Sequence, residues 1–253
     1  MNPDIIVELN YKRIGKGLPL MLLHGYPLDH TIWNNLIPHC QNDFDLILPD
    51  LRGFGKSPCV EAKYSMESFA DDLKNLLDKL KIERTYLAGH SMGGYVALSF
   101  AEKYPDKVLG LAMVASQTGE DSPEAKSKRY LAVEDVQKNG VGNIADQMSL
   151  KLSANDTSRK FLHKLILSQN KSGVIGALRA MAERKNLFSV LTNSTFPVIL
   201  IHGDADILIP VEKSLEMNAR SAKSFLSVIS GSGHMPMMDE PKKVAEAFRM
   251  FLR

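Results

Sequence analysis

The chain is poor in cysteine, with only Cys40 and Cys59 among 253 residues. Two cysteines are too few for a disulfide scaffold, and their spacing matches no metal-binding pattern. No stretch reaches the roughly 18 consecutive apolar residues that a membrane-spanning helix requires. Charge of one sign is also scarce, because 31 Lys and Arg are interspersed with 29 Asp and Glu. This balance argues against a nucleic-acid or anionic-membrane partner, which would need a concentrated basic face.

What the chain does contain is typical of a folded α/β protein. Its length allows one large domain or two small ones, and 44% of its residues are hydrophobic, an ordinary value for soluble proteins. Residues 1–15 lack the basic start and long apolar stretch of a signal peptide, so we expect a cytoplasmic location. No cofactor motif is recognisable, and we expect neither a cofactor nor a metal. The oligomeric state stays open between monomer and homodimer.

Short apolar runs alternate with helical patterns along most of the chain. The runs resemble strands covered on both faces of a sheet, and they occupy residues 18–23, 44–48, 85–88, 108–115, 198–201 and 225–229. A weaker alternation covers residues 5–9. Helical spacing marks residues 65–80, with Ser65 as a possible N-cap, residues 92–103, and residues 241–252. Such alternation predicts a mostly parallel central sheet with helices on both faces.

One long segment breaks this rhythm. Residues 119–190 contain no convincing strand run and are rich in Lys, Glu, Ser, Asn and Gln, with helical spacing of the apolar residues. We therefore predict a mostly helical insertion between two strands of the sheet. The predicted division is a core domain of residues 1–118 and 191–253 with an insertion of residues 119–190.

The strongest chemical signal is the sequence GHSMGG at residues 89–94. It follows one apolar run and opens the predicted helix at residue 92, which is the context that a G-x-S-x-G nucleophile motif requires. A sharp turn from strand to helix leaves Ser91 in a strained conformation, and Gly89 and Gly93 give that turn room. A serine in an ordinary Gly-rich turn is the competing interpretation. The flanking strand and helix favour a nucleophile.

A serine hydroxyl is a weak nucleophile and needs a base, which in turn needs an orienting acid. Of seven histidines, only His234 follows a late strand near the C-terminal end, in a Gly-rich loop. The acid should follow a strand between Ser91 and His234, where Asp204 and Asp206 compete. Spacing gives Asp206 only a modest advantage, with Asp204 as a turn former.

A further element is a possible oxyanion hole. The sequence HGYP at residues 24–27 follows an apolar run, and a turn at a strand end can point backbone N–H groups into a site. The N–H groups of Tyr26 and Met92 are the expected pair. Each such donor contributes about 2.7–4 kcal/mol in a transition state.

Taken together, these motifs resemble the α/β-hydrolase superfamily over nearly the whole chain except residues 119–190. The resemblance is carried by HGYP at 24–27, PDLRGFGKS at 49–57, GHSMGG at 89–94, GDADILIP at 203–210 and GSGHMPMMDEP at 231–241. It implies Ser91 as nucleophile, Asp206 as acid and His234 as base, since the family places its acid at this position before a proline. Asp50 and Arg52 would be structural, and residues 119–190 would form a cap over the pocket.

The predicted function is hydrolysis of carboxylic esters with small to medium, largely apolar acyl groups. Within the superfamily the chain most resembles small capped carboxylesterases, haloperoxidase-like esterases and enol-lactonases. Alternatives are a lactone, thioester or carbon–carbon bond hydrolase, perhydrolysis, or a slow-turnover ligand sensor, since fold does not fix function. We expect a small-molecule ester as partner. The predicted substrate contacts are Gly25, Met148, Met181 and Met235, and four methionines near the site suggest an apolar rim: Met92, Met235, Met237 and Met238.

Overall fold

The computed structural model describes residues 5–251, and Leu252, at the end of the last predicted helix, lies outside them. Its centre is one seven-stranded sheet in the order β1-β3-β2-β4-β5-β6-β7. The strands are β1 (Tyr11–Gly15), β2 (Leu18–Leu23), β3 (Phe44–Pro49), β4 (Thr85–His90), β5 (Val108–Val114), β6 (Val198–Gly203) and β7 (Ser224–Ile229). Only the edge strand β1 is antiparallel to its neighbour, so the sheet is mostly parallel, as predicted.

The β1 strand is the main departure from the predicted elements. The weak alternation at residues 5–9 is not a strand, although Val7 and Leu9 are buried and account for the pattern. The strand begins at Tyr11 and has only intermediate and exposed residues, because it lies at the sheet edge. A short edge strand with polar residues leaves little trace in hydrophobic periodicity.

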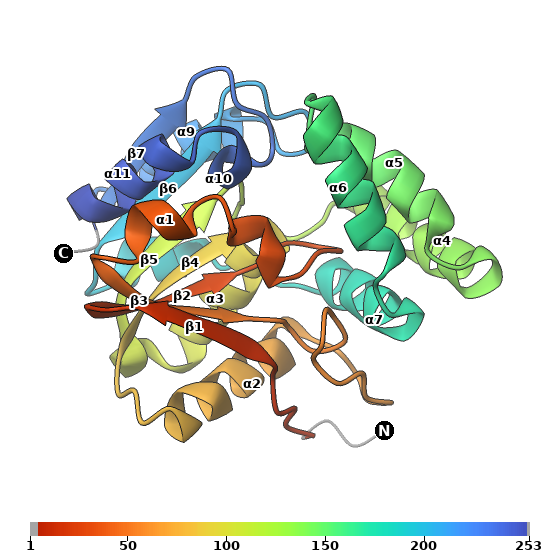
Figure 1. Ribbon diagram of the computed structural model, residues 1–253, viewed down its shortest axis with the longest axis horizontal. Helices are drawn as coiled ribbons and strands as arrows, with labels where there is room; N and C mark the ends of the chain where they lie inside the picture. Colours follow the sequence, from red (N-terminus) through yellow and green to blue (C-terminus); the bar gives the residue numbers. More distant parts are fainter. Residues whose placement is uncertain (1–4, 252–253) are drawn as a thin grey trace.

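Helices cover both faces of the sheet (Figure 1). They are α1 (Ile37–Cys40), α2 (Met66–Lys79), α3 (Met92–Lys103), α4 (Pro123–Asn139), α5 (Gly142–Leu152), α6 (Asp156–Leu167), α7 (Lys171–Ala182), α8 (Phe188–Asn193), α9 (Glu212–Arg220), α10 (Pro236–Asp239) and α11 (Pro241–Phe251), with short 3-10 helices η1 (His30–Trp33) and η2 (Pro105–Lys107). The hydrophobic core is correspondingly split in two. Successive β2 residues belong to different core clusters. Leu22 lies in the cluster that contains α1 and α11 residues, and Leu23 lies in the cluster that contains α2 and α3 residues.

The ends of two core helices show why the chain forms them there. Ser65 is the N-cap of α2: its hydroxyl accepts from the Ser68 N–H at 3.1 Å, and the Ser68 hydroxyl accepts from the Ser65 N–H at 3.0 Å. This reciprocal pair satisfies two amides that a helix start leaves free. The α3 helix, which begins directly after Ser91, is buried over most of its length, as expected for a central helix.

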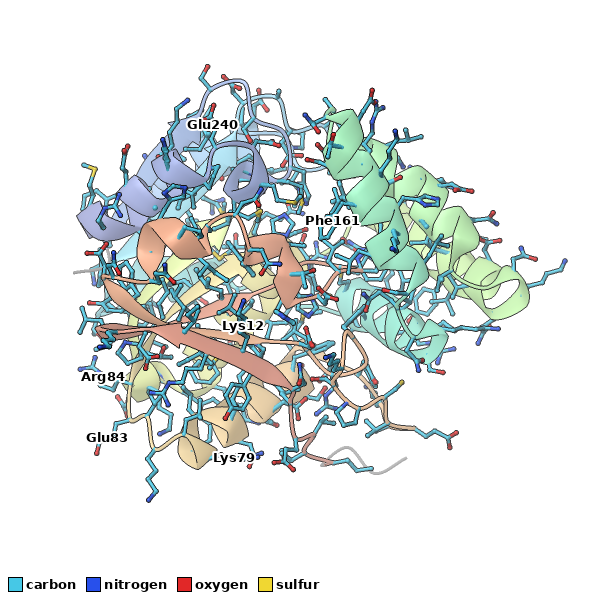
Figure 2. The ribbon with its side chains drawn as sticks, in the orientation of Figure 1. Lys12, Lys79, Glu83, Arg84, Phe161 and Glu240 are labelled. Atoms are coloured by element: carbon cyan, nitrogen blue, oxygen red, sulfur yellow. The ribbon has the colours of Figure 1, made fainter. Side chains whose placement is uncertain are left out.

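Between β5 and β6 the chain forms the four insertion helices α4, α5, α6 and α7, followed by α8. Figure 1 shows the four insertion helices gathered at one side of the sheet. Among them α4 packs on α7 and α5 packs on α6. No helix within residues 5–251 is both long and apolar enough to cross a membrane. Charged side chains of both signs lie on the surface, among them those of Lys12, Lys79, Glu83, Arg84 and Glu240 (Figure 2).

Candidate active site

The turn at Ser91 joins the buried strand β4 directly to α3. Ser91 has φ 50° and ψ −115°, a conformation that costs a non-glycine residue energy. A Cβ atom at Gly89 would lie 2.3 Å from the carbonyl oxygen of Gly93, and one at Gly93 would lie 2.4 Å from the carbonyl oxygen of Leu23. Both positions therefore admit only glycine. The backbone has the strained strand-to-helix geometry that the motif predicts.

The candidate acid and base meet in a buried hydrogen bond. Nδ1 of His234 lies 2.7 Å from Oδ2 of Asp206, and the two residues are 2% and 7% exposed. The other carboxylate oxygen, Oδ1, accepts from the N–H groups of Leu208 at 2.8 Å and Ile209 at 3.1 Å. The turn after β6 thus holds one carboxylate oxygen of Asp206, and the other oxygen orients the imidazole of His234.

Asp204, the competing acid, has a different partner. Its Oδ1 accepts from the backbone N–H of Gly231 at 2.7 Å, which ties the turn after β6 to the turn after β7. Asp206, and not Asp204, is therefore the carboxylate that the structure brings to His234. This is the turn-forming role that the sequence suggests for Asp204.

The charge on Asp206 is strongly stabilised. Burial disfavours its ionised form, but hydrogen bonds from His202 and His234 outweigh that effect, and together they hold the pKa of the carboxyl well below its usual range. Asp206 is consequently an anion at neutral pH. An anion in this position fixes the Nδ1–H tautomer of His234 and leaves Nε2 free to accept a proton.

A second histidine joins the loop that carries the candidate base to the strand before the candidate nucleophile. His90, which directly precedes Ser91, donates from Nε2 to the carbonyl oxygen of His234 at 2.8 Å. The two imidazole rings pack edge to face with centroids 4.9 Å apart. Burial and the neighbouring His234 lower the pKa of His90 well below its usual value, so it stays neutral. The loop that carries His234 is therefore bonded to the last residue of β4, directly before Ser91.

The turn after β2 lies against the strand-to-helix turn at Ser91. A Cβ atom at Gly25 would lie 2.5 Å from Nδ1 of His90, so glycine permits this close approach. The backbone N–H groups of Tyr26 and Met92 have no acceptor among the described residues. Two free amides beside a strained serine can bind a developing oxyanion.

The Tyr26 side chain is buried together with its hydroxyl. It is buried edge to face with Phe54, with ring centroids 6.4 Å apart, and its hydroxyl has no partner within residues 5–251. Burial raises the pKa of Tyr26 above its usual value, so the phenol remains a neutral donor.

The predicted methionine contacts occupy different environments. Met181, in α7, is 3% exposed, and its sulfur accepts from Nη1 of Arg129 at 3.4 Å. Met148, in α5, is partly buried against one of the core clusters. Met235 is fully buried in that cluster, and its part in substrate binding stays a prediction.

The suggested apolar rim is wrong for most of its members. Met92, Met235 and Met237 are essentially unexposed, because their side chains fill the space beneath the loops. Only Met238 is partly exposed. The three buried methionines pack in the core instead of forming an exposed edge.

An opening of about 370 Å³ lies beside the acid–base pair. Ala205 and Ile207, which flank Asp206, and Gly233, which precedes His234, form one wall, and the connection from α5 to α6 forms the other. Ile207 is 73% exposed at this opening and Leu150 is 60% exposed. The opening therefore has a mixed lining, with apolar side chains on both walls and the charged Lys151, Asp239 and Glu240.

Sequence reasoning did not find an ion-pair cluster at the ends of the insertion helices. Asp121 pairs with Nη1 of Arg184 at 2.6 Å and with Nε of Arg129. Arg184 also donates from Nε to the carbonyl oxygen of Gly119 at 2.9 Å and stacks on the ring of Tyr95 in α3. This cluster joins the start of the insertion to its end. Scattered single charges give no sequence signal for such a contact.

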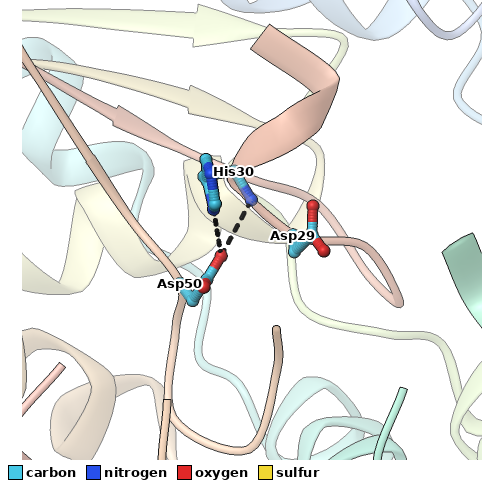
Figure 3. Close-up of side chains that lie close together, drawn as sticks. All are labelled: Asp29, His30 and Asp50. Atoms are coloured by element: carbon cyan, nitrogen blue, oxygen red, sulfur yellow. Dashed lines mark hydrogen bonds and ion pairs between the residues drawn. The ribbon is translucent and has the colours of Figure 1, made fainter. Parts of the chain in front are cut away.

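Within residues 5–251, Asp29, His30 and Asp50 are the one group spaced to hold a metal ion (Figure 3). Oδ1 of Asp50 already accepts from Nδ1 of His30 at 2.6 Å and from its backbone N–H at 3.1 Å. Oδ2 accepts from Asn10 at 2.8 Å and from the Lys56 N–H at 3.0 Å. These bonds use the carboxylate fully, and we assign Asp50 the structural role that the sequence suggests.

Comparison with known proteins agrees with this architecture. A family model described as the alpha/beta hydrolase fold matches residues 19–241. A pimeloyl-[acyl-carrier protein] methyl ester esterase of Aeromonas hydrophila is 26% identical over 97% of this chain and 100% of its own. A 2-hydroxymuconate semialdehyde hydrolase of a Pseudomonas species is 26% identical over 97% and 90%. A solved thermophilic esterase from Thermogutta terrifontis is 37% identical, with a TM-score of 0.93 over 98% of this chain and 93% of its own. The chain belongs to the α/β-hydrolase family.

Proposed function

We propose that this hydrolase cleaves carboxylic esters of small to medium, largely apolar acyl groups through Ser91, His234 and Asp206. The observation that carries the proposal is the buried His234–Asp206 hydrogen bond of 2.7 Å, fastened through His90 to the strained turn at Ser91. Nucleophile, base and orienting acid are the three groups that acyl transfer requires.

In the proposed reaction, Nε2 of His234 takes the Ser91 proton while Oγ attacks the acyl carbon. The N–H groups of Tyr26 and Met92 hold the resulting oxyanion, and His234 then protonates the leaving alcohol. Water repeats the sequence on the acyl-enzyme, which releases the carboxylic acid and restores Ser91. Asp206 stays ionised throughout and stabilises the imidazolium.

Two of the three proteins compared above support an ester substrate. The Thermogutta terrifontis protein, 37% identical to this chain, is described as an esterase, and the Aeromonas hydrophila relative is a methyl ester esterase. We extend this activity to the present chain because Asp206 is bonded to His234, and His90, the residue before Ser91, is bonded to the same loop. We further propose that residues 119–190 form a cap over the acyl group, with Met148 and Met181 among its contacts.

The test is the initial rate on p-nitrophenyl esters of increasing acyl length, for the wild type beside Ser91→Ala. We expect Ser91-dependent turnover that is greatest for short to medium chains. Ser116→Ala is a matched control, because its hydroxyl donates to the Ser91 carbonyl oxygen at 2.8 Å and supplies no reacting atom. Equal rates for the wild type and Ser91→Ala would refute the proposal.

A parallel panel of lactone, thioester and β-diketone substrates distinguishes the other reactions open to the same three residues. Ester rates above those of the whole panel support the proposal. A burst of nitrophenol followed by a stalled acyl-enzyme would instead indicate a ligand sensor.

A further inference from the structure

A fully buried histidine that the proposed reaction does not use lies behind the candidate acid. His202 is near the end of β6, is 0% exposed, and has its Nε2 atom 3.2 Å from Oδ2 of Asp206. This is the same carboxylate oxygen that accepts from Nδ1 of His234. One oxygen atom therefore faces two imidazole rings.

The other contacts of His202 show that its Nε2 atom carries a proton. Nε2 lies 2.7 Å from the carbonyl oxygen of Ile209, and because a carbonyl can only accept, Nε2 carries the proton. Nδ1 lies 2.8 Å from the hydroxyl of the buried Ser214 in α9, which can donate to it. Both ring nitrogens therefore have partners, and the Nε2–H that is bonded to Ile209 also lies close to Asp206, with Nε2 3.2 Å from Oδ2.

We propose that His202 is a positioning residue: its Nε2–H holds the Asp206 carboxylate in place and limits how strongly that carboxylate attracts the proton on His234. This inference rests on the proposed function, because it concerns the acid of the same triad. A carboxylate whose charge is shared with more donors stabilises the neighbouring imidazolium less. His202 thus adjusts the basicity of His234 through Asp206, without touching substrate.

The groups that face this pair limit what else could act on it. Among the described residues, Asp206 is paired with His202 and His234, and its second oxygen accepts only backbone amides. His234 faces Asp206 and the neutral His90. From α9 the only side chain bonded to His202 is that of Ser214. Apart from His234, the Nε2–H of His202 is therefore the side-chain donor near Asp206 that a substitution can remove.

Two amide substitutions separate positioning from bulk. In His202→Gln the side-chain amide nitrogen can occupy the position of Nε2 and still donate to Asp206. In His202→Asn the amide reaches only the position of Nδ1, near Ser214. We expect Gln to keep the wild-type pH profile. We expect Asn to lower kcat about tenfold with KM within about twofold, and to move the acid limb of kcat/KM up by about 0.5–1 pH unit.

The direction of that shift follows from the charge. Without the His202 donor, Asp206 pulls more strongly on the His234 proton, so a higher pH is needed to free the base. The midpoint of the His234 ring titration, followed by NMR in the same variants, should move in the same direction. This readout needs no turnover and separates failure of this inference from failure of the proposed function.

A loss of folding in His202→Asn leaves a second test, Ser214→Ala, which removes the donor that fixes the His202 tautomer. We expect a smaller shift of the acid limb in the same direction. The inference is overturned if both His202→Gln and His202→Asn keep the acid limb and the NMR midpoint at wild-type values. If His202→Asn does not fold, wild-type values in Ser214→Ala overturn it instead. Equal shifts in the Gln and Asn variants would overturn it as well, since they would reflect packing.

Discussion

His90 and His234 are joined twice: Nε2 of His90 donates to the His234 carbonyl oxygen at 2.8 Å, and their rings pack with centroids 4.9 Å apart. The two histidines are 144 residues apart in the chain, so this contact joins two distant segments at the candidate site. It joins the turn at Ser91 to the loop that carries His234. The same ring lies beside Gly25, where the candidate oxyanion loop approaches.

Removal of the His90 ring should separate the base from the nucleophile. We expect His90→Leu to lower kcat about tenfold or more, because misplacement of a reacting group by about 1 Å can cost about 100-fold in rate. The measurement is steady-state kinetics on a p-nitrophenyl ester. His90→Gln, which can still donate to the carbonyl oxygen, is the matched control and should retain more activity. Equal losses in the two variants would contradict the role of this hydrogen bond.

The two neighbouring carboxylates give a direct test of the acid. Asp206→Asn should lower kcat by about 10⁴-fold, since an amide favours the wrong tautomer of His234. Asp204→Asn should keep kcat within about twofold and cost about 1 kcal/mol of unfolding free energy from the weakened bond to Gly231. Kinetics and thermal unfolding of both variants decide the matter. A larger kinetic loss in the Asp204 variant would reverse the assignment.

The candidate oxyanion loop can be displaced by one methyl group. In Gly25→Ala the new Cβ would lie 2.5 Å from Nδ1 of His90, so the loop must shift and carry the Tyr26 amide with it. Loss of one oxyanion donor lowers kcat by about 10²–10³-fold. We expect a fall in kcat of this order with little change in KM. An unchanged kcat would show that the Tyr26 amide does not serve the transition state.

Loss of the buried ion pair of Arg52 should lower the free energy of unfolding and leave kcat nearly unchanged. Its guanidinium pairs with Asp72 in α2, with Nη2 2.7 Å from Oδ1, and both side chains are 1% exposed. Asp72→Asn leaves a buried cation without its anion, which costs about 3–5 kcal/mol of unfolding free energy. Denaturant unfolding should show that loss, whereas kcat below the unfolding temperature should stay near the wild-type value. A selective fall in kcat would instead place this pair in the reaction.

Asp50 predicts a pH dependence of stability. Burial disfavours its charge, but bonds from His30 and the Lys56 amide prevail and hold its pKa below the usual range, whereas the bond to Asp50 raises the pKa of His30. The Asp50 contribution is therefore present above its unfolded pKa of about 3.9 and is lost as the pH falls. The His30 contribution is fully present below its unfolded pKa of about 6.5 and is lost as the pH rises through its raised folded-state pKa.

We therefore expect Asp50→Asn to lose about 3 kcal/mol of unfolding free energy near pH 5–6. The difference from the wild type should shrink toward pH 3 and toward pH 8. Urea unfolding across this range provides the measurement. A difference that is constant with pH would contradict the ionic origin of the effect.

The sequence predicted the parts of this molecule that local rules determine. The Ser91 turn needs glycines at fixed offsets, and α2 needs Ser65 before its apolar face, so both are readable from neighbouring residues. The edge strand at Tyr11 was missed because exposed strands lack apolar periodicity. His202 was missed because its contact with Asp206 depends on a tight turn four residues long, which composition does not reveal.

The choice between Asp204 and Asp206 shows the same limit. Both follow β6 within a few residues, and only the folded loop turns one toward His234 and the other toward Gly231. Residues that line an acyl pocket are harder still, since a buried Met235 and a half-buried Met148 give the same hydrophobic pattern in the sequence. Spacing alone therefore left the acid open, and the resemblance to a family was what selected Asp206.

The central claim is that Ser91 forms a covalent acyl-enzyme, and trapping the nucleophile tests it most directly. The wild type, Ser91→Ala and His234→Ala are treated with diethyl p-nitrophenyl phosphate, and the labelled residue is located by peptide mass spectrometry. We predict one diethylphosphoryl group per chain on Ser91 in the wild type, with parallel loss of ester hydrolysis. Labelling should be absent in Ser91→Ala and greatly slowed in His234→Ala. A label on another residue, or full activity in the wild type after Ser91 is labelled, would contradict the account.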